Sequence, residues 1–334
     1  MKIEDIKNIK VIYNGSDDDV LEDVKVTYEE TFYGANKIYE TLSTKYPNVQ
    51  LVLIRKESIA EQLAEFEEGS LVFNYCEWTG NNIKDELELL KEVEARNFPY
   101  TGCSYDEHGL LLDKTIMKNE IKKRGFDNLN YIFADENTDV SELNGLSFPV
   151  IIKPTLEHCS IGLDDDSVAF DAQTALDKAK SVSKKYQQKV MVEEFANGNE
   201  YQAFVFETEK GLETLPVYET RYKASDKPVL VTFEDNWTDS HIDEKVERIG
   251  ILQDQEKDQA IRLLATKLFA SFGGKGYVRV DFRERDGKLY VLELNPNPSI
   301  AWTDEQDFIN VCATGAGMTF EQVLDWVVSG ARKV

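Results

Sequence analysis

Charged and amide side chains alternate with apolar ones along two segments near the end of the chain, YVRVDF at 277–282 and VLELN at 291–295. Side chains of a strand point alternately to opposite faces, so the polar residues of each segment share one face. These residues are Arg279, Asp281, Glu293 and Asn295. If an odd number of residues, three or five, connects the strands, Asp281 lies opposite Glu293 and Arg279 opposite Asn295. A two-residue turn would scatter the four groups, because a slip of one residue turns a strand over.

Three oxygen ligands beside one guanidinium suit a magnesium ion that is held by one or two carboxylates and by substrate phosphates. Arg279 would then stabilise the charge on a transferred phosphoryl group. The alternative is a solvated sheet face on which charges simply alternate. Pro296 and Pro298 count against that alternative, because they end the strand and direct Asn295 instead of continuing the sheet.

A lysine and a loop of small residues indicate where phosphates would bind. Lys153 ends the apolar segment FPVIIK at 148–153, where a lone lysine is costly to half-bury. The loop that follows, 155–162, offers backbone N–H groups that would cover a triphosphate. With a single glycine, this loop carries little weight by itself.

The segment MVEEFANGNE at 191–200 reads as a strand that runs into a glycine turn. Backbone groups and Glu193 would bind the edge of an adenine, and Glu200 would accept hydrogen bonds from ribose hydroxyls. A plain strand and turn in an acidic protein explains this segment equally well when it is taken by itself.

These residues need a scaffold, and hydrophobic periodicity predicts one of alternating strands and helices. Apolar runs predict strands at 10–13, 49–54, 71–75, 148–153, 190–195, 201–207, 213–218, 276–283 and 289–295. Helical spacing predicts helices at 24–44, 83–96, 110–124, 172–186 and 255–272, and 221–247 reads as a loop. The chain begins as a βαβ unit and divides into an α/β unit at 1–105, an α+β unit at 106–195 and a C-terminal unit at 196–334.

The chain has 334 residues and a net charge of -24. This charge argues against nucleic acid or an anionic membrane as a partner. Four cysteines without short paired spacing and only three histidines suggest neither a zinc site nor a disulfide framework. The N-terminus has no apolar signal core and no run of about 18 apolar residues occurs, so we expect a cytoplasmic protein.

Taken in order, five segments resemble the ATP-grasp enzymes, and among them most closely the D-alanine–D-alanine ligases: Asp113-Lys114, 148–162, 192–200, 279–282 and 293–298. Their ordered combination is far more specific than any one segment. The resemblance implies an ATP-grasp fold, in which an N-terminal Rossmann-like βαβ domain precedes two α+β units that clasp ATP. It makes 1–105 a substrate domain, and 106–195 and 196–334 the two ATP-grasp subdomains, the second with the metal site.

The resemblance also implies a role for particular residues. ATP binding falls to Lys114, Lys153, Glu193, Glu194, Ala196 and Glu200, with the lysines on the phosphates. Metal binding falls to Asp281, Glu293 and Asn295, and catalysis to Arg279, Arg221, Tyr222 and Ser160. Arg221-Tyr222 matches a mobile loop with a Lys-Tyr pair, and arginine keeps the charge but changes the hydrogen-bonding geometry. Two Mg²⁺ ions, with Mn²⁺ as a substitute, and a homodimer are implied by the family.

Three segments depart from the family pattern where substrates bind. His158-Cys159-Ser160-Ile161-Gly162 replaces Gly-Ser-Ser-x-Gly, NYCEWTG at 74–80 stands where the ligases have a His-Gly motif, and SIAW at 299–302 replaces a Gly-Met-Thr-type segment. Trp78 and Trp302 would suit a bulkier substrate, or they are packing residues. We therefore expect the nucleotide chemistry to be shared and the substrates to differ.

The resulting hypothesis is an ATP-dependent ligase that joins a small-molecule carboxylate and an amine, most simply two amino acids, through an acyl-phosphate, with release of ADP and phosphate. Two alternatives stay open. One is an ATP-grasp tailoring enzyme that ligates an amino acid to a secondary metabolite, and the other is a catalytically silent ATP-binding regulatory protein. The presence of all four polar residues of the two C-terminal strands argues against the silent protein, since a pure binder has no need of the full metal set.

Overall fold

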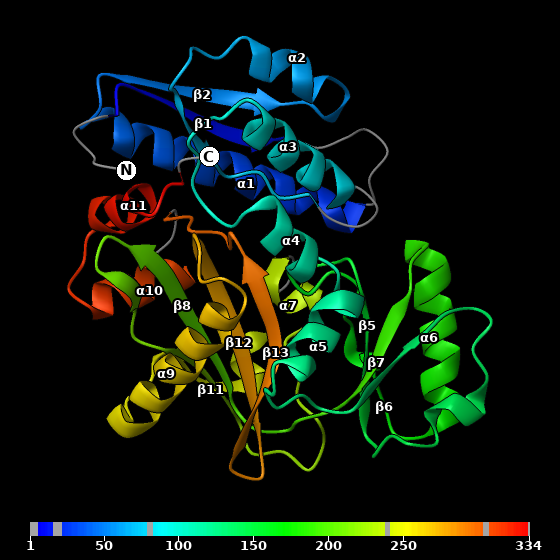
Figure 1. Ribbon diagram of the computed structural model, residues 1–334. Helices are drawn as coiled ribbons and strands as arrows, with labels where there is room; N and C mark the ends of the chain where they lie inside the picture. The colour runs from blue at the N-terminus through cyan, green and yellow to red at the C-terminus, as the bar shows by residue number, and fades with distance from the viewer. Residues whose placement is uncertain (1–5, 16–21, 79–82, 238–240, 303–306, 333–334) are drawn as a thin grey trace.

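The computed structural model describes residues 6–15, 22–78, 83–237, 241–302 and 307–332. Their strands form three sheets, and helices cover the faces of these sheets (Figure 1). The expected division at 105 and 195 stays a prediction. No helix in the described ranges is long and apolar enough to cross a membrane.

The N-terminal sheet is parallel, with strand order β2-β1-β3. Its strands are β1 (Asn8–Asn14), β2 (Asn48–Ile54) and β3 (Leu71–Asn74). The long helix α1 (Glu22–Ser43) connects β1 to β2, which confirms the predicted βαβ beginning. The helices α2 (Ile59–Ala64) and α3 (Ile83–Ala95) follow β2 and β3. All four residues of β3 are buried, as expected for a strand of a covered parallel sheet.

The predicted helix at 110–124 is wrong in one respect, because the structure has two helices there. They are α4 (Tyr105–Leu111) and α5 (Lys114–Lys123). The chain breaks because the Asp113 carboxylate accepts a hydrogen bond from the Thr115 backbone N–H and caps the second helix. Gly125 then follows α5 with a φ of +81°, a left-handed conformation that glycine adopts readily at the end of a helix.

A four-stranded antiparallel sheet has the order β4-β7-β5-β6. Its strands are β4 (Tyr131–Ala134), β5 (Val150–Pro154), β6 (Val168–Ala169) and β7 (Val190–Glu194). Helix α6 (Ala172–Tyr186) packs against it with the bounds that the sequence predicts. The sequence did not predict β4, because its four residues lie in a stretch that is polar on both sides.

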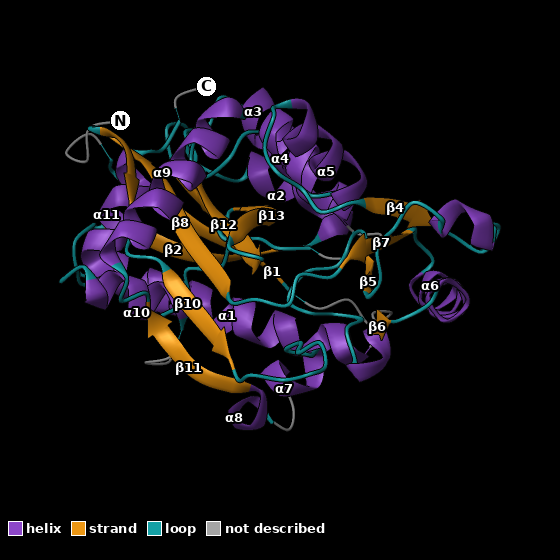
Figure 2. Cartoon of the chain, turned by 90° about the horizontal axis from the view of Figure 1, so that it is seen from below, coloured by secondary structure: helices purple, strands orange, loops and turns teal. Residues whose placement is uncertain are grey.

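The largest sheet has the order β11-β10-β8-β12-β13, with β9 paired to β8. Its strands are β8 (Glu200–Thr208), β9 (Gly211–Thr214), β10 (Tyr218–Tyr222), β11 (Val246–Ile251), β12 (Tyr277–Arg285) and β13 (Lys288–Pro296). Helix α9 (Gln255–Ser271) covers one face (Figure 2). The predicted strand at 213–218 is correct only at its ends, which belong to β9 and β10, because Pro216 has no N–H to donate and interrupts the strand between them.

The region 221–247 is not the loop that the sequence suggested. Within the described residues it contains the end of β10, the short helices α7 (Phe233–Trp237) and α8 (Ile242–Lys245), and the start of β11. Short 3₁₀ turns occur elsewhere, at Lys56–Ser58, Val140–Leu143 and Asp165–Ser167. Elements this short carry too few residues for a periodic pattern to be read.

A β-bulge sets the register between β12 and β13. The strands are joined by the two-residue turn Asp286-Gly287. In a regular strand pair, such a turn would place Asp281 and Glu293 out of register. Instead Phe282 pairs with Val291 and Asp281 pairs with Glu293, so that Leu292 is an extra residue on β13. This extra residue restores the pairing that an odd loop would have given. An odd loop is therefore not needed for the pairings of Asp281 with Glu293 and of Arg279 with Asn295, both of which are present.

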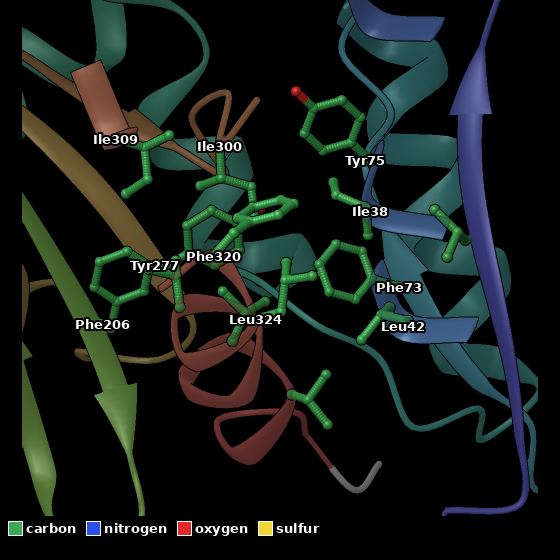
Figure 3. Close-up of a cluster of buried hydrophobic side chains, with 14 of the residues drawn as sticks. Ile38, Leu42, Phe73, Tyr75, Phe206, Tyr277, Ile300, Ile309, Phe320 and Leu324 are labelled. Atoms are coloured by element: carbon green, nitrogen blue, oxygen red, sulfur yellow. The ribbon is translucent and has the colours of Figure 1, made fainter. Parts of the chain in front are cut away.

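The last two helices, α10 (Phe308–Gly315) and α11 (Phe320–Ser329), join the largest sheet to the N-terminal sheet. One hydrophobic cluster contains Phe206 of β8, Leu324 of α11 and Leu42 of α1. In Figure 3, Leu324 of α11 lies between Phe206 on one side and Leu42 on the other. On β8 the alternate residues Ala203 and Val205 face α9 and belong to a second cluster.

Candidate active site

A cavity of about 460 Å³ lies between the four-stranded and the largest sheet. Ten of the predicted site residues line it: Lys114, Lys153, Ser160, Glu193, Glu194, Ala196, Glu200, Arg279, Asp281 and Glu293. Asn295 lines a smaller adjoining cavity of about 70 Å³, and Arg221 and Tyr222 line neither cavity. Residues from both ends of the chain thus meet at one place.

Glu293 lines the cavity and is held there by two neighbouring side chains. Its Oε1 is 2.9 Å from Lys114 Nζ and 3.1 Å from His158 Nδ1. Burial by itself would raise the pKa of Glu293, but Lys114 and His158 hold it well below its ordinary value. The carboxylate is therefore ionised and retains the negative charge that a cation would need.

Arg279 and Asp281 form a two-pronged ion pair along β12. Arg279 Nε donates to Asp281 Oδ1 at 2.7 Å, and Arg279 Nη2 donates to Oδ2 at 2.8 Å. Asn295 Nδ2 also donates to Asp281 Oδ2, at 3.0 Å. Burial raises the pKa of Asp281, and Arg279 counteracts only part of this rise. The guanidinium thus lies in the plane of a carboxylate that directly faces Glu293 across the strand pair.

Glu193 on β7 is held by two lysines at the far end of the cavity. Its Oε2 is 2.8 Å from Lys153 Nζ, and its Oε1 is 2.6 Å from Lys118 Nζ. The side chain is fully buried, which would raise its pKa, yet the two ammonium groups keep the pKa below its ordinary value. Lys153 therefore contacts a carboxylate as well as the cavity.

Glu194 and Ala196 lie beside Glu193, where the sequence placed the adenine. The Glu194 carboxylate accepts hydrogen bonds from Asn130 Nδ2 at 2.9 Å, Ser147 N at 3.0 Å and Arg285 Nη1 at 3.0 Å. These contacts tie together β7, β12 and the segments before β4 and β5. Ala196 is buried, and it contributes its backbone to the cavity wall.

Glu200 pairs with Arg283, whose Nη1 donates to Glu200 Oε1 at 2.7 Å. The guanidinium lies over the rings of Tyr222 at 4.7 Å and Phe195 at 4.5 Å, and its Nη2 donates to the Val229 carbonyl. Tyr222 is thereby placed next to the predicted ribose carboxylate although it does not line the cavity. Burial, followed by the charge of Glu200, raises the pKa of Tyr222 well above its ordinary value.

Arg221 points to the other face of β10, where its Nη2 donates to Glu219 Oε2 at 3.0 Å. Its predicted role in a closing loop stays a prediction. Ser160 lies on the cavity wall and accepts a hydrogen bond from Asn236 Nδ2 at 3.1 Å. Ser160 and its neighbour Cys159 both have positive φ angles, 60° and 54°, a backbone region that costs non-glycine residues energy and is common at functional sites.

Three residues at the site were not assigned a role from the sequence. His158 was quoted only as part of a changed motif, although it contacts Glu293. Arg283 follows Asp281 at the same two-residue spacing, so strand alternation would have predicted its position. Lys118 lies four residues after Lys114, and helical periodicity would have placed both lysines on one face of α5.

Comparison with known proteins places the chain in a family. Residues 123–329, more than half of the chain, match the protein family described as D-ala D-ala ligase C-terminus. The D-alanine–D-alanine ligase B of Chromobacterium violaceum is 28% identical over 244 residues, which cover 71% of this chain and 75% of that protein.

Two solved structures have a similar fold over nearly the whole length. The D-alanine–D-alanine ligase from Bacillus anthracis complexed with ATP gives a TM-score of 0.72 at 18% identity, covering 97% of each chain. The VanG D-Ala:D-Ser ligase from Enterococcus faecalis gives a TM-score of 0.69 at 19% identity, covering 97% of this chain and 98% of that chain. The chain therefore belongs to the D-ala D-ala ligase C-terminus family, as an ATP-grasp enzyme that forms carbon–nitrogen bonds with ATP.

Proposed function

We propose that the protein joins the carboxylate of one amino acid or related small acid to the amine of a second molecule, through an acyl-phosphate, with release of ADP and phosphate. One contact carries this proposal. Lys114, expected on the phosphates, lies 2.9 Å from Glu293, expected on the metal. A phosphate bound by the lysine is thus adjacent to the carboxylates that would hold a cation against it.

The donor set at this place fits Mg²⁺. Asp281, Glu293 and Asn295 offer only oxygen ligands, which hard divalent cations prefer. In the described part of the chain, no three His, Cys, Asp or Glu side chains gather closely enough to hold a metal by themselves. Phosphate oxygens would complete the shell, as is usual for magnesium bound with a nucleotide. Magnesium would supply neutralisation of phosphate charge at this site.

The chain's own residues account for the rest of the reaction. Lys114 and Lys153 hold the phosphates, and Glu193, Ala196 and Glu200 hold the base and ribose. The substrate carboxylate oxygen attacks the terminal phosphorus and ADP leaves, which turns a poor electrophile into an acyl-phosphate. The amine nitrogen then attacks the carbonyl carbon, loses a proton, and phosphate leaves. Arg279 stabilises the negative charge that develops in both steps. Closure of the segment after Arg221 would exclude water.

Solved structures named as a D-alanine–D-alanine ligase and as a D-Ala:D-Ser ligase have a similar fold, but this chain differs from the family pattern at the three segments described above. Of the altered 74–80 motif, Thr79 and Gly80 lie outside the described residues. Trp78 is 2% exposed and belongs to the core of the N-terminal sheet, which favours the packing reading for this residue. We therefore propose amino-acid-like substrates other than two D-alanines. A homodimer, as in the family, is part of the proposal.

Substitution Glu293→Gln tests the function, because it keeps the shape and removes the charge that would bind the cation. Phosphate release that depends on ATP and Mg²⁺, assayed over single and paired L- and D-amino acids with product masses, should fall by about 100-fold or more. The exposed Glu136→Gln is the matched control. Full activity in Glu293→Gln would refute the metal role, and AMP instead of ADP as the product would refute the acyl-phosphate route.

A further inference from the structure

Lys118 is a fully buried lysine that connects two sheets. It lies on α5, and its Nζ is 2.6 Å from Glu193 Oε1 on β7. The same Nζ donates to the carbonyl of Val291 at 2.9 Å and to that of Leu292 at 3.4 Å, both on β13. An ammonium group has three N–H donors, and three acceptors surround it here.

The two carbonyls belong to the bulge that sets the metal site. Leu292 is the extra residue that lets Asp281 face Glu293 in spite of the two-residue turn. A bulge leaves backbone groups outside the regular ladder, and a buried carbonyl needs a donor. Lys118 supplies that donor to the buried Val291 carbonyl and also contacts, at 3.4 Å, the carbonyl of the half-buried Leu292 immediately before Glu293.

The carboxylate that Lys118 contacts belongs to Glu193, the residue proposed to bind the base of the nucleotide. Glu193 lines the cavity, and it is fixed on one oxygen by Lys118 and on the other by Lys153. With Lys118 removed, Glu193 would keep only its contact with Lys153. Its other carboxylate oxygen would no longer be held, so the side chain could rotate. Burying an ammonium group is costly, and the contacts of Lys118 with Glu193, Val291 and Leu292 compensate for that cost. Loss of one contact would therefore weaken the other two.

We propose that Lys118 is a positioning residue that sets both ends of the active site at once: it orients Glu193 for the base and holds the bulge that places Glu293 opposite Asp281. The inference rests on the proposed function, because it takes Glu193 as a nucleotide contact and Glu293 as a metal ligand. Lys118 itself does not line the cavity. It would therefore act through these two carboxylates and not by touching the nucleotide.

Calorimetric binding of ATP, first with EDTA and then with Mg²⁺, separates the two ends. In Lys118→Met, the affinity for metal-free ATP should fall about tenfold, the loss expected for a charged hydrogen bond. The further gain in affinity on adding Mg²⁺ should also shrink by several-fold. Lys122→Met, an exposed lysine on the same helix, should change neither quantity and serves as the control.

Glu193→Gln discriminates between the ends, because it leaves the hydrogen bonds of Lys118 to the bulge in place. It should weaken metal-free binding and leave the Mg²⁺ gain unchanged.

If Lys118→Met does not fold, the double variant with Glu193→Gln removes both buried charges, and its Mg²⁺ gain should still shrink. An unchanged Mg²⁺ gain in the Lys118 variants, or unchanged metal-free affinity, would overturn the inference. Binding reports on Lys118 even if no ligase activity is found.

Discussion

Single residues in the cavity owe their charge state to specific neighbours and not to exposure. Glu193 is buried and Glu293 is half-buried, and both have lowered pKa values because Lys118 and Lys153 contact the first and Lys114 and His158 contact the second. Asp281 has a raised pKa even with Arg279 beside it. The site therefore contains carboxylates of different basicity within one strand pair, and the difference is set by which cation each one meets.

Glu194 offers a test of this reasoning at a carboxylate on another sheet. Burial by itself would raise its pKa, but Asn130, Ser147 and Arg285 hold the pKa below the ordinary value of 4.5. A lowered folded-state pKa contributes stability that is complete above the unfolded pKa and is lost as the pH falls through the folded pKa. Glu194→Gln should therefore cost about 2 kcal/mol at pH 7 and progressively less below about pH 4.5. Urea unfolding between pH 3 and 7 measures the difference, and a cost that grows toward acid would contradict the prediction.

Elements position residues through their ends, and α5 is the clearest case. The cap at Asp113 starts the helix one residue before Lys114, and the Lys114 backbone N–H donates to the Thr155 carbonyl at 3.1 Å. The hydrogen bond attaches the first residue of α5 to the start of the loop 155–162, which was expected to cover the phosphates. The Asp113 cap thus sets the start of α5 and, with it, the position of Lys114, the residue proposed to bind phosphate.

Asp113→Ala and Asp171→Ala form a matched pair, since each removes the cap of one helix, α5 or α6. Both should lose about 1 kcal/mol of unfolding free energy. Only Asp113→Ala should weaken ATP binding, because Lys114 follows that cap directly. Thermal unfolding and ATP titration of both variants check this. Equal ATP affinities in the two variants would mean that the cap does not place Lys114.

At the scale of the whole molecule, the N-terminal sheet and the largest sheet share one core. Leu324 of α11 is fully buried in the cluster that also holds Leu42 and Phe73 (Figure 3). Packing of this kind links the stability of segments that are far apart in the sequence. The N-terminal sheet and the strands β12 and β13 should therefore unfold together.

Leu324→Ala would leave a cavity in this shared core. We expect a loss of about 2 to 5 kcal/mol in unfolding free energy, with a single transition as in the parent protein. Glu321→Ala, exposed on the same helix, should change stability by less than about 0.5 kcal/mol. Chemical denaturation followed by fluorescence and circular dichroism measures both, and two separate transitions would show that the sheets do not share a core.

The sequence by itself determined much of the local structure. Helix α6 has the predicted bounds, and the strands that carry Lys153, Glu193 and Arg279 lie where apolar runs placed them. These predictions succeed because hydrophobic periodicity and caps act over a few residues. The ordered motifs also identified the family, since the segments that carry the resemblance keep their order along the chain.

Tertiary structure decided the rest. The bulge at Leu292, and not an odd loop, aligned Asp281 with Glu293, and a turn rule cannot foresee a bulge inside a strand. Lys118 and His158 gained their partners only when α5 and the loop after β5 met β13, contacts that span more than 130 residues. Arg221 and Tyr222 are adjacent in sequence, yet one pairs with Glu219 and the other packs on Arg283, because neighbours on a strand face opposite ways.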